Sequence, residues 1–412
     1  MSARLLAGLS GRDPLSLERH VELHGPPPSL ERERLLRELE AAGLRGRGGA
    51  GFPSAVKAHN LGRRRPVLVV NGAESEPMGM KDRVLLTRTP HLVLDGAQAA
   101  AHALAVREIV LVAPQGSLPL VAAALRERRA LGRAPAEVEL RAAAPGYVAG
   151  EESALLAHLE GRPAKPRVKP PLPVERGLQG RPTLVHNAET LAHLALIARY
   201  GAAWFRERGT QEQPGTTLVT VAGAVQAPGV YEIDLGTPLA RVLETAGGPL
   251  EELRALLVGG YFGAWLDASD AHVQLADIAL RPLGATVGAG IVFALGATAC
   301  GVAETARLAR WMAGESAGQC GPCANGLPAL ADLLERQATG RAVQGDADRL
   351  QRWLWMVQRR GACHHPDGTA RMIASATRVF AQELSDHARR GPCRACSVQA
   401  LRLPRAGAAK AA

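Results

Sequence analysis

The residues best suited to ligand chemistry form a glycine-rich run from residue 43 to residue 53, which reads Gly-Leu-Arg-Gly-Arg-Gly-Gly-Ala-Gly-Phe-Pro. Glycine adopts positive φ and allows close approach to the backbone, so successive N–H groups can cradle a phosphate. Arg45 and Arg47 add positive charge. The run is neither a P-loop nor the usual dinucleotide fingerprint that follows a strand. We predict an anion-binding loop, with a flexible turn as the alternative.

Three further polar segments carry candidate binding groups. The first, 71–83, reads Asn-Gly-Ala-Glu-Ser-Glu-Pro-Met-Gly-Met-Lys-Asp-Arg and follows an apolar strand, so its side chains emerge at a strand end. The second, 145–153, places Glu151 and Glu152 where a helix begins, where negative charge is favoured. The third, 182–190, contains His186 and an N-cap pattern. The alternatives are a solvated acidic loop, a plain helix-start signal and a buried core histidine.

Lysine is rare in this chain and its placement is informative. Of 49 basic residues only Lys57, Lys81, Lys165, Lys169 and Lys410 are lysine. Four of the five lie in or beside polar segments, and arginine cannot replace the compact charge of lysine in a tight site. Chance is the alternative, but the clustering favours a polar binding site.

Six cysteines offer metal or redox chemistry. Cys320 and Cys323 form one C-x-x-C pair, Cys363 lies forty residues on, and 393–396 holds a second pair. Iron–sulfur clusters usually take four cysteines, two such pairs could instead bind zinc, and a redox dithiol is a third option. Cys300 precedes an expected helix and should lie a helix length, roughly 20 Å, from Cys320, so we leave it out of the ligand set.

The elements that must position these groups alternate between strand and helix. Apolar strands are expected at 65–71, 108–113 and 137–142, with helices at 91–106 and 118–130. This order predicts a largely parallel α/β sheet with ligands beyond the carboxyl ends of its strands.

The rest of the chain changes character twice. An ordered loop is expected at 161–182 and a helix at 188–206, followed by a β-plus-helix region and then a nearly all-helical one with cysteine-bearing turns. We therefore expect three domains, at 1–208, 209–296 and 297–412, within the usual size range.

Composition restricts the classes of protein. The 412 residues are 47% hydrophobic and carry a net charge of +10, but aromatic residues make up only 3% and no nucleic-acid-binding signature is present. We expect no nucleic acid as partner. No run of about 18 apolar residues predicts a membrane span, and the absence of an export signal favours the cytoplasm.

Taken jointly and in order, the motifs resemble the NADH-binding 51 kDa flavoprotein subunit of respiratory complex I (the F subunit of NADH-quinone oxidoreductase) and its relatives in hydrogenases and formate dehydrogenases. The match covers nearly the whole chain. It implies an α/β fold, with a Rossmann-like FMN/NADH domain, a β-grasp-like (SLBB-type) domain and a C-terminal helical iron–sulfur domain.

The resemblance also implies roles for individual residues. Glu76 and Glu152 would be catalytic and position the nicotinamide ribose and ring, and Phe52 would pack on adenine. Cys320, Cys323 and Cys363 would hold an iron–sulfur cluster, expected to be 4Fe-4S. The full set of implied cofactor-binding residues is Gly46, Arg47, Gly48, Gly49, Gly51, Phe52, Lys57, Asn71, Glu74, Glu76, Tyr147, Gly150, Glu151, Glu152, Lys169, His186 and Asn187.

Four positions depart from the family pattern. Ala317 stands at the first cluster-ligand position and Ala73 at an acidic one, while Asn60 and Leu172 replace aromatic residues that stack on adenine. Each lost stack could cost on the order of 1 kcal/mol of NADH binding. The fourth cluster ligand could be Cys393, Cys396, His364 or a non-protein ligand; alternatively, the cluster is three-iron, labile or absent.

The resemblance implies an activity and partners. NADH would reduce FMN, and electrons would leave through the cluster to an acceptor subunit, for which a thioredoxin-like 2Fe-2S protein and a membrane-associated redox protein are candidates. The chain would then be cytoplasmic, or peripheral to the membrane through that partner. The alternatives are an FMN electron-transfer protein that does not use NADH and a non-catalytic flavin- or zinc-binding assembly subunit.

Overall fold

A four-stranded parallel sheet forms the centre of the first part of the molecule. In the computed structural model of the chain, which describes residues 3–11, 13–132 and 137–404, the strand order is β3-β2-β1-β4. The strands are β1 (Val67–Asn71), β2 (Glu108–Ala113), β3 (Glu137–Ala142) and β4 (Thr183–Asn187). Because all four are parallel, their carboxyl ends lie at one edge, with Asn71 directly opposite Asn187.

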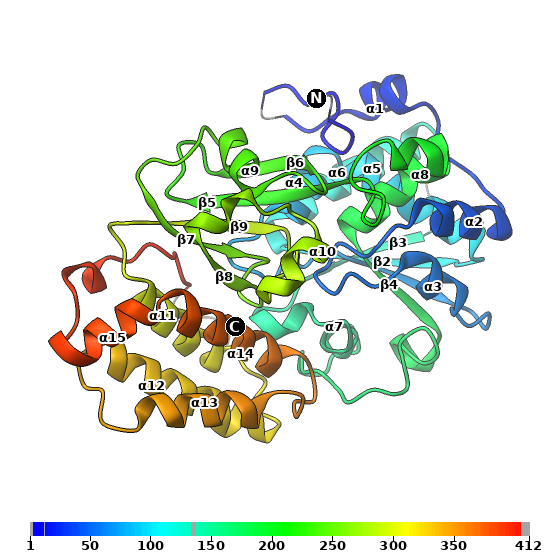
Figure 1. Cartoon of the computed structure of the whole chain (residues 1–412). Helices are drawn as coiled ribbons and strands as arrows, with labels where there is room; N and C mark the ends of the chain where they lie inside the picture. Colours follow the sequence, from blue (N-terminus) through cyan, green and yellow to red (C-terminus); the bar gives the residue numbers. More distant parts are fainter. Residues whose placement is uncertain (1–2, 12, 133–136, 405–412) are drawn as a thin grey trace.

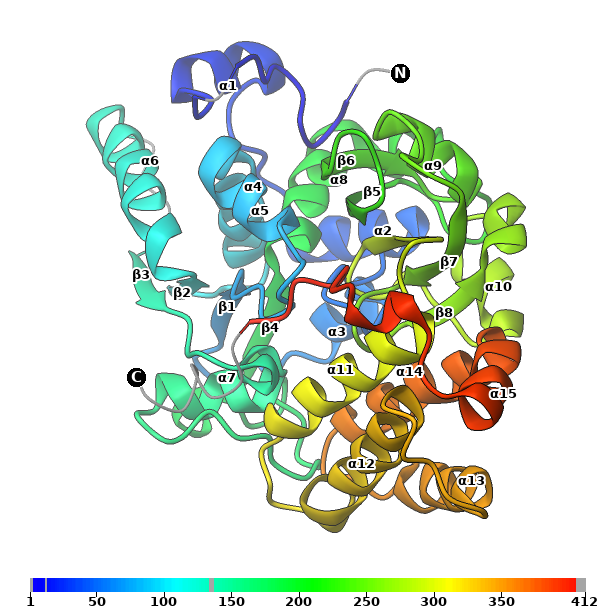
Figure 2. The ribbon, with the colours of Figure 1, turned by 90° about the vertical axis from the view of Figure 1, so that its left-hand side faces the viewer.

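Apolar side chains on both faces of this sheet are covered by helices. Leu68 and Val70 point into the main core, whereas Val67 and Val69 join a smaller cluster with Leu155 of the opposite layer. Figure 2 shows α4, α5 and α6 on one side of the sheet and α7 on the other. The helices of this part are α1 (Leu17–His24), α2 (Arg32–Ala42), α3 (Ser54–His59), α4 (Lys81–Arg88), α5 (Pro90–Ala103), α6 (Leu118–Ala130), α7 (Glu152–Leu159) and α8 (Ala188–Arg206).

A second sheet of five strands follows, in the order β6-β5-β9-β7-β8. Its strands are β5 (Thr216–Gly223), β6 (Gly229–Asp234), β7 (Leu253–Val258), β8 (Ala264–Asp267) and β9 (Ile291–Gly296), with the helices α9 (Leu239–Thr245) and α10 (Asp277–Leu280). Only the central pair β5 and β9 is parallel, and the other pairs are antiparallel. A mixed sheet with a packed helix corresponds to the β-plus-helix region expected from the sequence.

Five helices make up the last part: α11 (Gly301–Gly314), α12 (Leu327–Ala338), α13 (Asp346–Val357), α14 (His365–Val379) and α15 (Ala381–Arg390). They pack together on one side of the second sheet, with α11 and α14 nearer to it than α12 and α13 (Figure 1), and their core includes Trp265 and Phe293 of that sheet. Short single turns occur at η1 (Gln115–Ser117), η2 (Tyr147–Gly150), η3 (Leu178–Gly180), η4 (Ala268–His272), η5 (Arg281–Leu283), η6 (Pro322–Gly326, a π turn) and η7 (Arg394–Ser397).

The predicted fold class is confirmed, with a Rossmann-like parallel core and a helical C-terminal region. The segment 183–187 was expected to be a polar stretch that leads into the helix at 188–206. It forms the edge strand β4 instead. Ser117, which precedes α6, lies in the short turn η1, and its side chain makes no capping hydrogen bond to α6. None of the described helices combines the length and apolar character needed to cross a bilayer.

Candidate functional site

Two asparagines meet where β1 and β4 end. The Asn187 side-chain amide donates to the backbone carbonyl of Asn71 at 3.1 Å and to Asp82 at 2.7 Å. Lys81 in turn donates to Asn187 Oδ1 at 3.0 Å, and the same oxygen caps α8. The edge strand is therefore fastened to β1 through polar groups that the sequence had singled out for binding.

A network of buried charged residues lies beside the junction where β1 and β4 end. Lys81 Nζ lies 2.8 Å from Asp82 and 3.1 Å from Glu189, and Arg47 Nε lies 4.0 Å from Glu189. Burial opposes ionisation of Glu189, but Lys81, His193 and Arg47 outweigh it and hold the pKa of Glu189 below its usual range. Neither Glu189 nor its partner Lys81 was proposed as a site residue, since only the folded chain brings α4 and α8 together.

The glycine loop folds back on itself over the strand ends. Gly46 N–H donates to Phe52 O at 2.8 Å, and Ser54 N–H donates to Leu44 O at 2.9 Å. Gly49 and Gly51 have φ of 103° and 62°, which strongly favours glycine. The loop thus adopts a defined conformation.

The glycine loop also borders a small cavity against the second sheet. The lining residues are Arg45, Gly46, Arg47, Gly49, Gly51, Lys81, Gln213, Thr217, Asp277, Val287, Gly288 and Gly290. Arg47 is 8% exposed, and its guanidinium donates to Thr216 O at 3.0 Å. That side chain therefore secures the loop to β5, a role the sequence did not indicate.

Two of the rare lysines pair with the two adjacent glutamates. Lys57 Nζ lies 2.6 Å from Glu152 and donates to Val185 O at 2.7 Å. Lys169 lies 2.9 Å from Glu151 and 3.6 Å from Glu152. Glu151 also accepts N–H bonds from the first turn of α7, so the helix-start interpretation of this residue is confirmed. Its predicted part in cofactor binding stays a prediction.

Glu76 connects three segments of the chain. It accepts the Tyr147 hydroxyl proton at 2.7 Å and the Tyr261 N–H at 2.8 Å. Burial raises the pKa of Glu76 to about 7 despite these two bonds. Gly260 lies so close that an added Cβ would sit 3.0 Å from the carboxyl group. The first sheet, the turn at 147–150 and the second sheet therefore converge on one carboxyl group.

Glu74, two residues earlier, has a different task. Its carboxylate accepts the N–H groups of Asp82 and Arg83, each at 2.9 Å, and so caps α4. Burial and the charge of Asp82 raise the pKa of Glu74 to about 7. Its predicted cofactor contact stays a prediction beside this structural role.

Asn71 and His186 are the remaining polar residues at the ends of β1 and β4. Asn71 donates to Gly150 O at 3.1 Å and so fastens the 147–150 turn to β1. His186 is buried, and its Nε2 has no hydrogen-bond partner among the described residues. Burial and the charge of Lys57 lower the pKa of His186 to about 3, so its imidazole is neutral.

The three predicted cluster cysteines lie in the turns that precede α12 and α14. Cys323 lies buried in the π turn before α12, and burial raises the pKa of its thiol, with Cys320 and Cys363 as further contributors. Burial also raises the pKa of Cys363, and the charge of Glu151 adds to that effect. Cys363 of this set therefore lies close enough to the 151–152 pair for the charge of Glu151 to act on its thiol.

Direct bonds join the cysteine loop to the first domain. Gln319 donates its side-chain amide to Pro166 O, and Tyr147 N–H donates to Glu315 at 2.9 Å. The helical part thus contacts both the 161–182 loop and the residue that holds Glu76.

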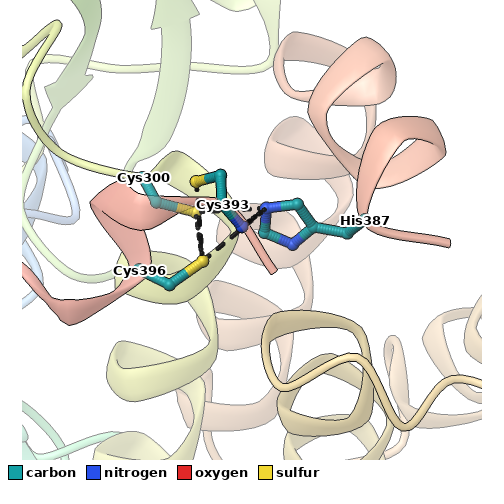
Figure 3. Close-up of side chains that lie close together, drawn as sticks. All are labelled: Cys300, His387, Cys393 and Cys396. Atoms are coloured by element: carbon teal, nitrogen blue, oxygen red, sulfur yellow. Dashed lines mark hydrogen bonds between the residues drawn. The ribbon is translucent and has the colours of Figure 1, made fainter. Parts of the chain in front are cut away.

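The other three cysteines form a separate set. Cys300, Cys393 and Cys396 converge with His387 so that their ligand atoms all lie within 4.8 Å of one another, as Figure 3 shows. Cys300 precedes α11 and Cys320 follows its far end, so the expected separation of these two residues holds. Cys393 and Cys396, two of the four candidates for the fourth cluster ligand, therefore lie with Cys300 at the opposite end of α11 from Cys320. His364 remains, with its side chain 94% exposed and 3.8 Å from Asp367.

A parallel α/β sheet with a glycine loop over its strand ends, followed by a mixed sheet and a cysteine-bearing helical region, defines a class of flavin-binding iron–sulfur redox proteins. Three family models match in that order. They are described as the Nuo51 FMN-binding domain at residues 39–196, the SLBB domain at 218–260, and the NADH-ubiquinone oxidoreductase-F iron-sulfur binding region at 303–387.

Individual relatives agree with these matches. The NADH-quinone oxidoreductase F subunit of Streptomyces coelicolor is 33% identical, over 86% of this chain and 82% of that protein. The corresponding F subunit, number 2, of Rhizobium meliloti is 31% identical, over 88% and 90% respectively. The chain therefore belongs to the family of NADH-quinone oxidoreductase F subunits, with its FMN-binding and iron–sulfur binding regions.

Hydrogenase subunits are also similar. The alpha subunit of the NAD-reducing hydrogenase HoxS of Cupriavidus necator is 34% identical over 81% of this chain. A solved NAD+-reducing NiFe hydrogenase in the air-oxidised state superposes with a TM-score of 0.81, at 35% identity over 88% of this chain. The chain spans only 57% and 64% of the length of these two hydrogenase chains.

Proposed function

We propose that this chain is the NADH-oxidising flavoprotein subunit of a larger redox assembly. The observation that carries the proposal is the convergence, at one edge of the parallel sheet, of the glycine loop, the Asn71–Asn187 pair and the 151–152 glutamates, with the three cluster cysteines next to them. Bound FMN supplies the redox chemistry, since a flavin accepts a hydride and gives up electrons singly, while the protein supplies binding and orientation.

The residues at this edge fit FMN. The glycine loop contains turns with positive φ, and its backbone N–H groups can donate hydrogen bonds to a phosphate. The loop residues in this set are Gly46, Arg47, Gly48, Gly49 and Gly51. Lys57 supplies a cation, and the neutral, buried His186 has a ring nitrogen without a partner. Asn71, Glu74 and Asn187 stand with them at the strand ends. We assign FMN binding to this set.

The residues for NADH lie around Glu76 and the 151–152 pair. Glu76, held between Tyr147 and Tyr261, and Glu152, held by Lys57, would orient the nicotinamide ribose and ring. Gly150, Glu151 and Lys169 would complete this side of the site, because Lys169 bridges both glutamates. Phe52 is 52% exposed at the rim of the glycine loop, where its ring is free to stack on adenine.

Cys320, Cys323 and Cys363 are the donor set for the 4Fe-4S cluster, since soft thiolates are its usual ligands. A fourth ligand would come from His364 or from outside the protein. Electrons would leave to an acceptor subunit, for which a thioredoxin-like 2Fe-2S protein and a membrane-associated redox protein are the candidates. We place the chain in the cytoplasm, held at the membrane periphery through such a partner.

Steady-state kinetics tests this proposal. The purified, flavin-loaded chain should reduce ferricyanide with NADH as donor, without any partner subunit. A second candidate, an FMN protein reduced by a protein donor, is favoured by Asn60 and by Leu172, which stand where aromatic residues were expected and leave Phe52 alone to stack on adenine. Bound flavin that stays oxidised with NADH but is bleached by a reduced ferredoxin would establish that candidate and overturn the first.

A further inference from the structure

We propose that Cys300, His387, Cys393 and Cys396 bind a structural zinc ion, separate from the iron–sulfur cluster. All four ligand atoms lie within 4.8 Å of one another, and they come from the start of α11, the end of α15 and the turn η7. Figure 3 shows the four side chains pointing toward one another. The iron–sulfur family model ends at His387, and three of the four residues lie outside its match.

The distances fit a single tetrahedral ion. Zinc bonds of about 2.3 Å to sulfur and 2.0–2.1 Å to nitrogen place two sulfurs about 3.8 Å apart, and a sulfur and a nitrogen about 3.6 Å apart. The Cys396 sulfur lies 3.5 Å from that of Cys300 and 3.6 Å from that of Cys393. His387 Nε2 lies 3.6 Å from the Cys396 sulfur and 3.8 Å from that of Cys300. An iron–sulfur cluster would spread these atoms more widely, since each cysteine binds a different iron.

The histidine is oriented as a ligand. Its Nδ1 lies 3.2 Å from the backbone carbonyl of Gln337, a distance at which Nδ1–H donates to that oxygen. Such a bond selects the tautomer whose Nε2 carries a lone pair, and carbonyl partners of this kind are usual behind metal-binding histidines. His387 is only 3% exposed, so this lone pair faces the sulfurs rather than water; Cys393 N–H, at 3.4 Å, is its only hydrogen-bond donor besides the thiols among the described residues.

Cys300 makes one contact that suits a metal-bound thiolate and one that zinc would replace. Cys300 is fully buried at the N-cap of α11, and its sulfur accepts the Ala303 N–H at 3.3 Å. A helix N-terminus stabilises negative charge on sulfur. Without a metal the Cys300 thiol donates to Glu383 at 2.9 Å, and Glu383 also pairs with Arg254 at 2.9 Å, so zinc binding would replace the thiol's bond to this carboxylate. Zinc binding would release the three thiol protons to water.

The site has the character of a structural centre. Four protein ligands close the coordination sphere and leave no position for a substrate, as in structural rather than catalytic zinc sites. The ligands join two positions 87 residues apart, Cys300 and His387, and fasten the segment after α15 onto α11. The same segment is held further along by Leu401, which is buried and whose N–H donates to Glu304 at 2.8 Å.

Elemental analysis of the full chain tests the proposal. The protein would be expressed with added zinc sulfate, purified anaerobically and dialysed against EDTA. We expect one equivalent of zinc in the wild type, loss of zinc but not of iron in Cys396→Ser, and loss of iron but not of zinc in Cys320→Ser. Absence of zinc from the wild type, retention of zinc by Cys396→Ser, or a Cys393–Cys396 disulfide in its place would overturn the assignment.

Zinc-edge X-ray absorption of the wild type serves if the variants do not fold. Flavin and iron do not interfere with it. A shell of three sulfurs at about 2.3 Å and one nitrogen at about 2.0 Å is expected. A shell of oxygen and nitrogen alone would contradict the site. Neither measurement depends on NADH oxidation, so failure of the proposed function and failure of the zinc site are distinguishable.

Discussion

The cysteine sets at the two ends of α11 are built for different tasks. The set of Cys320, Cys323 and Cys363 includes one cysteine, Cys363, on which the charge of Glu151 acts, and the segment just before Cys320 bonds to Pro166 and Tyr147 of the first domain. The set at the other end of α11 is enclosed by α11, α15 and the segment after it, with a histidine as its fourth member. We propose that the first set exchanges electrons with a cofactor and that the second holds a chain segment. On this proposal the same residue type serves electron transfer in one region and stability in the other.

The largest expected difference between the two sets lies in electron output. Cys323→Ser should remove iron and abolish reduction of a one-electron protein acceptor, because a buried cluster thiolate is lost, whereas Cys396→Ser should retain iron and most of that activity. Iron and acid-labile sulfide analysis, with stopped-flow reduction of a ferredoxin-type acceptor, would compare the two variants. Equal iron loss in both would break the comparison, since the two sets would then belong to one centre.

Thermal stability should show the opposite pattern. Removing the proposed zinc by Cys396→Ser should lower the Tm by on the order of 5 °C, because the segment after α15 loses its attachment. Reduction of bound flavin by NADH should be unchanged in the same variant. Differential scanning calorimetry beside a flavin assay would measure both. A Tm equal to that of the wild type would remove the structural role of the second set.

NADH binding near the first cysteine set should respond to an added aromatic side chain that can stack on adenine. Leu172 is 46% exposed at a position where the resemblance implies an aromatic residue, so Leu172→Tyr should lower the KM for NADH by about 2- to 12-fold, from 0.5–1.5 kcal/mol per stack. Phe52→Ala should raise it by a similar factor. Leu131→Tyr, at an exposed position at the end of α6, is the matched control. An equal change of KM in the control would show that no adenine site lies at Leu172.

The smallest expected effect is a change in folding stability with pH. It concerns Glu76, which connects the proposed NADH site to the second sheet. Its folded pKa, about 7, lies above its ordinary 4.5 because burial favours the neutral acid. The stability contributed by the neutral form is therefore fully present below pH 4.5 and is lost as pH rises through about 7. Glu76→Gln should gain stability relative to the wild type over that window.

Urea unfolding at about pH 5 and about pH 8 would measure this change. Glu74, whose pKa also lies at about 7, is present in both proteins, so the difference between them isolates Glu76. A stability difference that does not vary with pH would contradict the proposed neutral, buried carboxyl group.

Local pattern was enough to predict much of the fold. The apolar run at 108–113 and the helix at 118–130 appear with the bounds that the sequence predicts, because burial and helical spacing act over neighbouring residues. Strand order was beyond that reasoning: β4 lies beside β1 although 111 residues separate Asn71 from Thr183, and its short run TLVHN includes a histidine.

The candidate site divides in the same way. Motifs within one segment, such as the glycine loop, were visible in the sequence. Arg47, Lys81 and Glu189 show their structural roles only once α4, α8 and β5 pack together. Cys300 was left out of the ligand set because of its expected distance from Cys320, while its actual partners lie 87 to 96 residues further along the chain. The available signal was His387, which stands six residues before the second C-x-x-C pair.

The central claim, that this chain takes hydride from NADH onto its own flavin, is tested most directly by an anaerobic NADH titration of the flavin-loaded protein. The account predicts that the visible flavin absorbance bleaches with about one equivalent of NADH for the flavin, in both the wild type and Cys323→Ser. Flavin that stays oxidised with excess NADH, yet bleaches with dithionite, would contradict it.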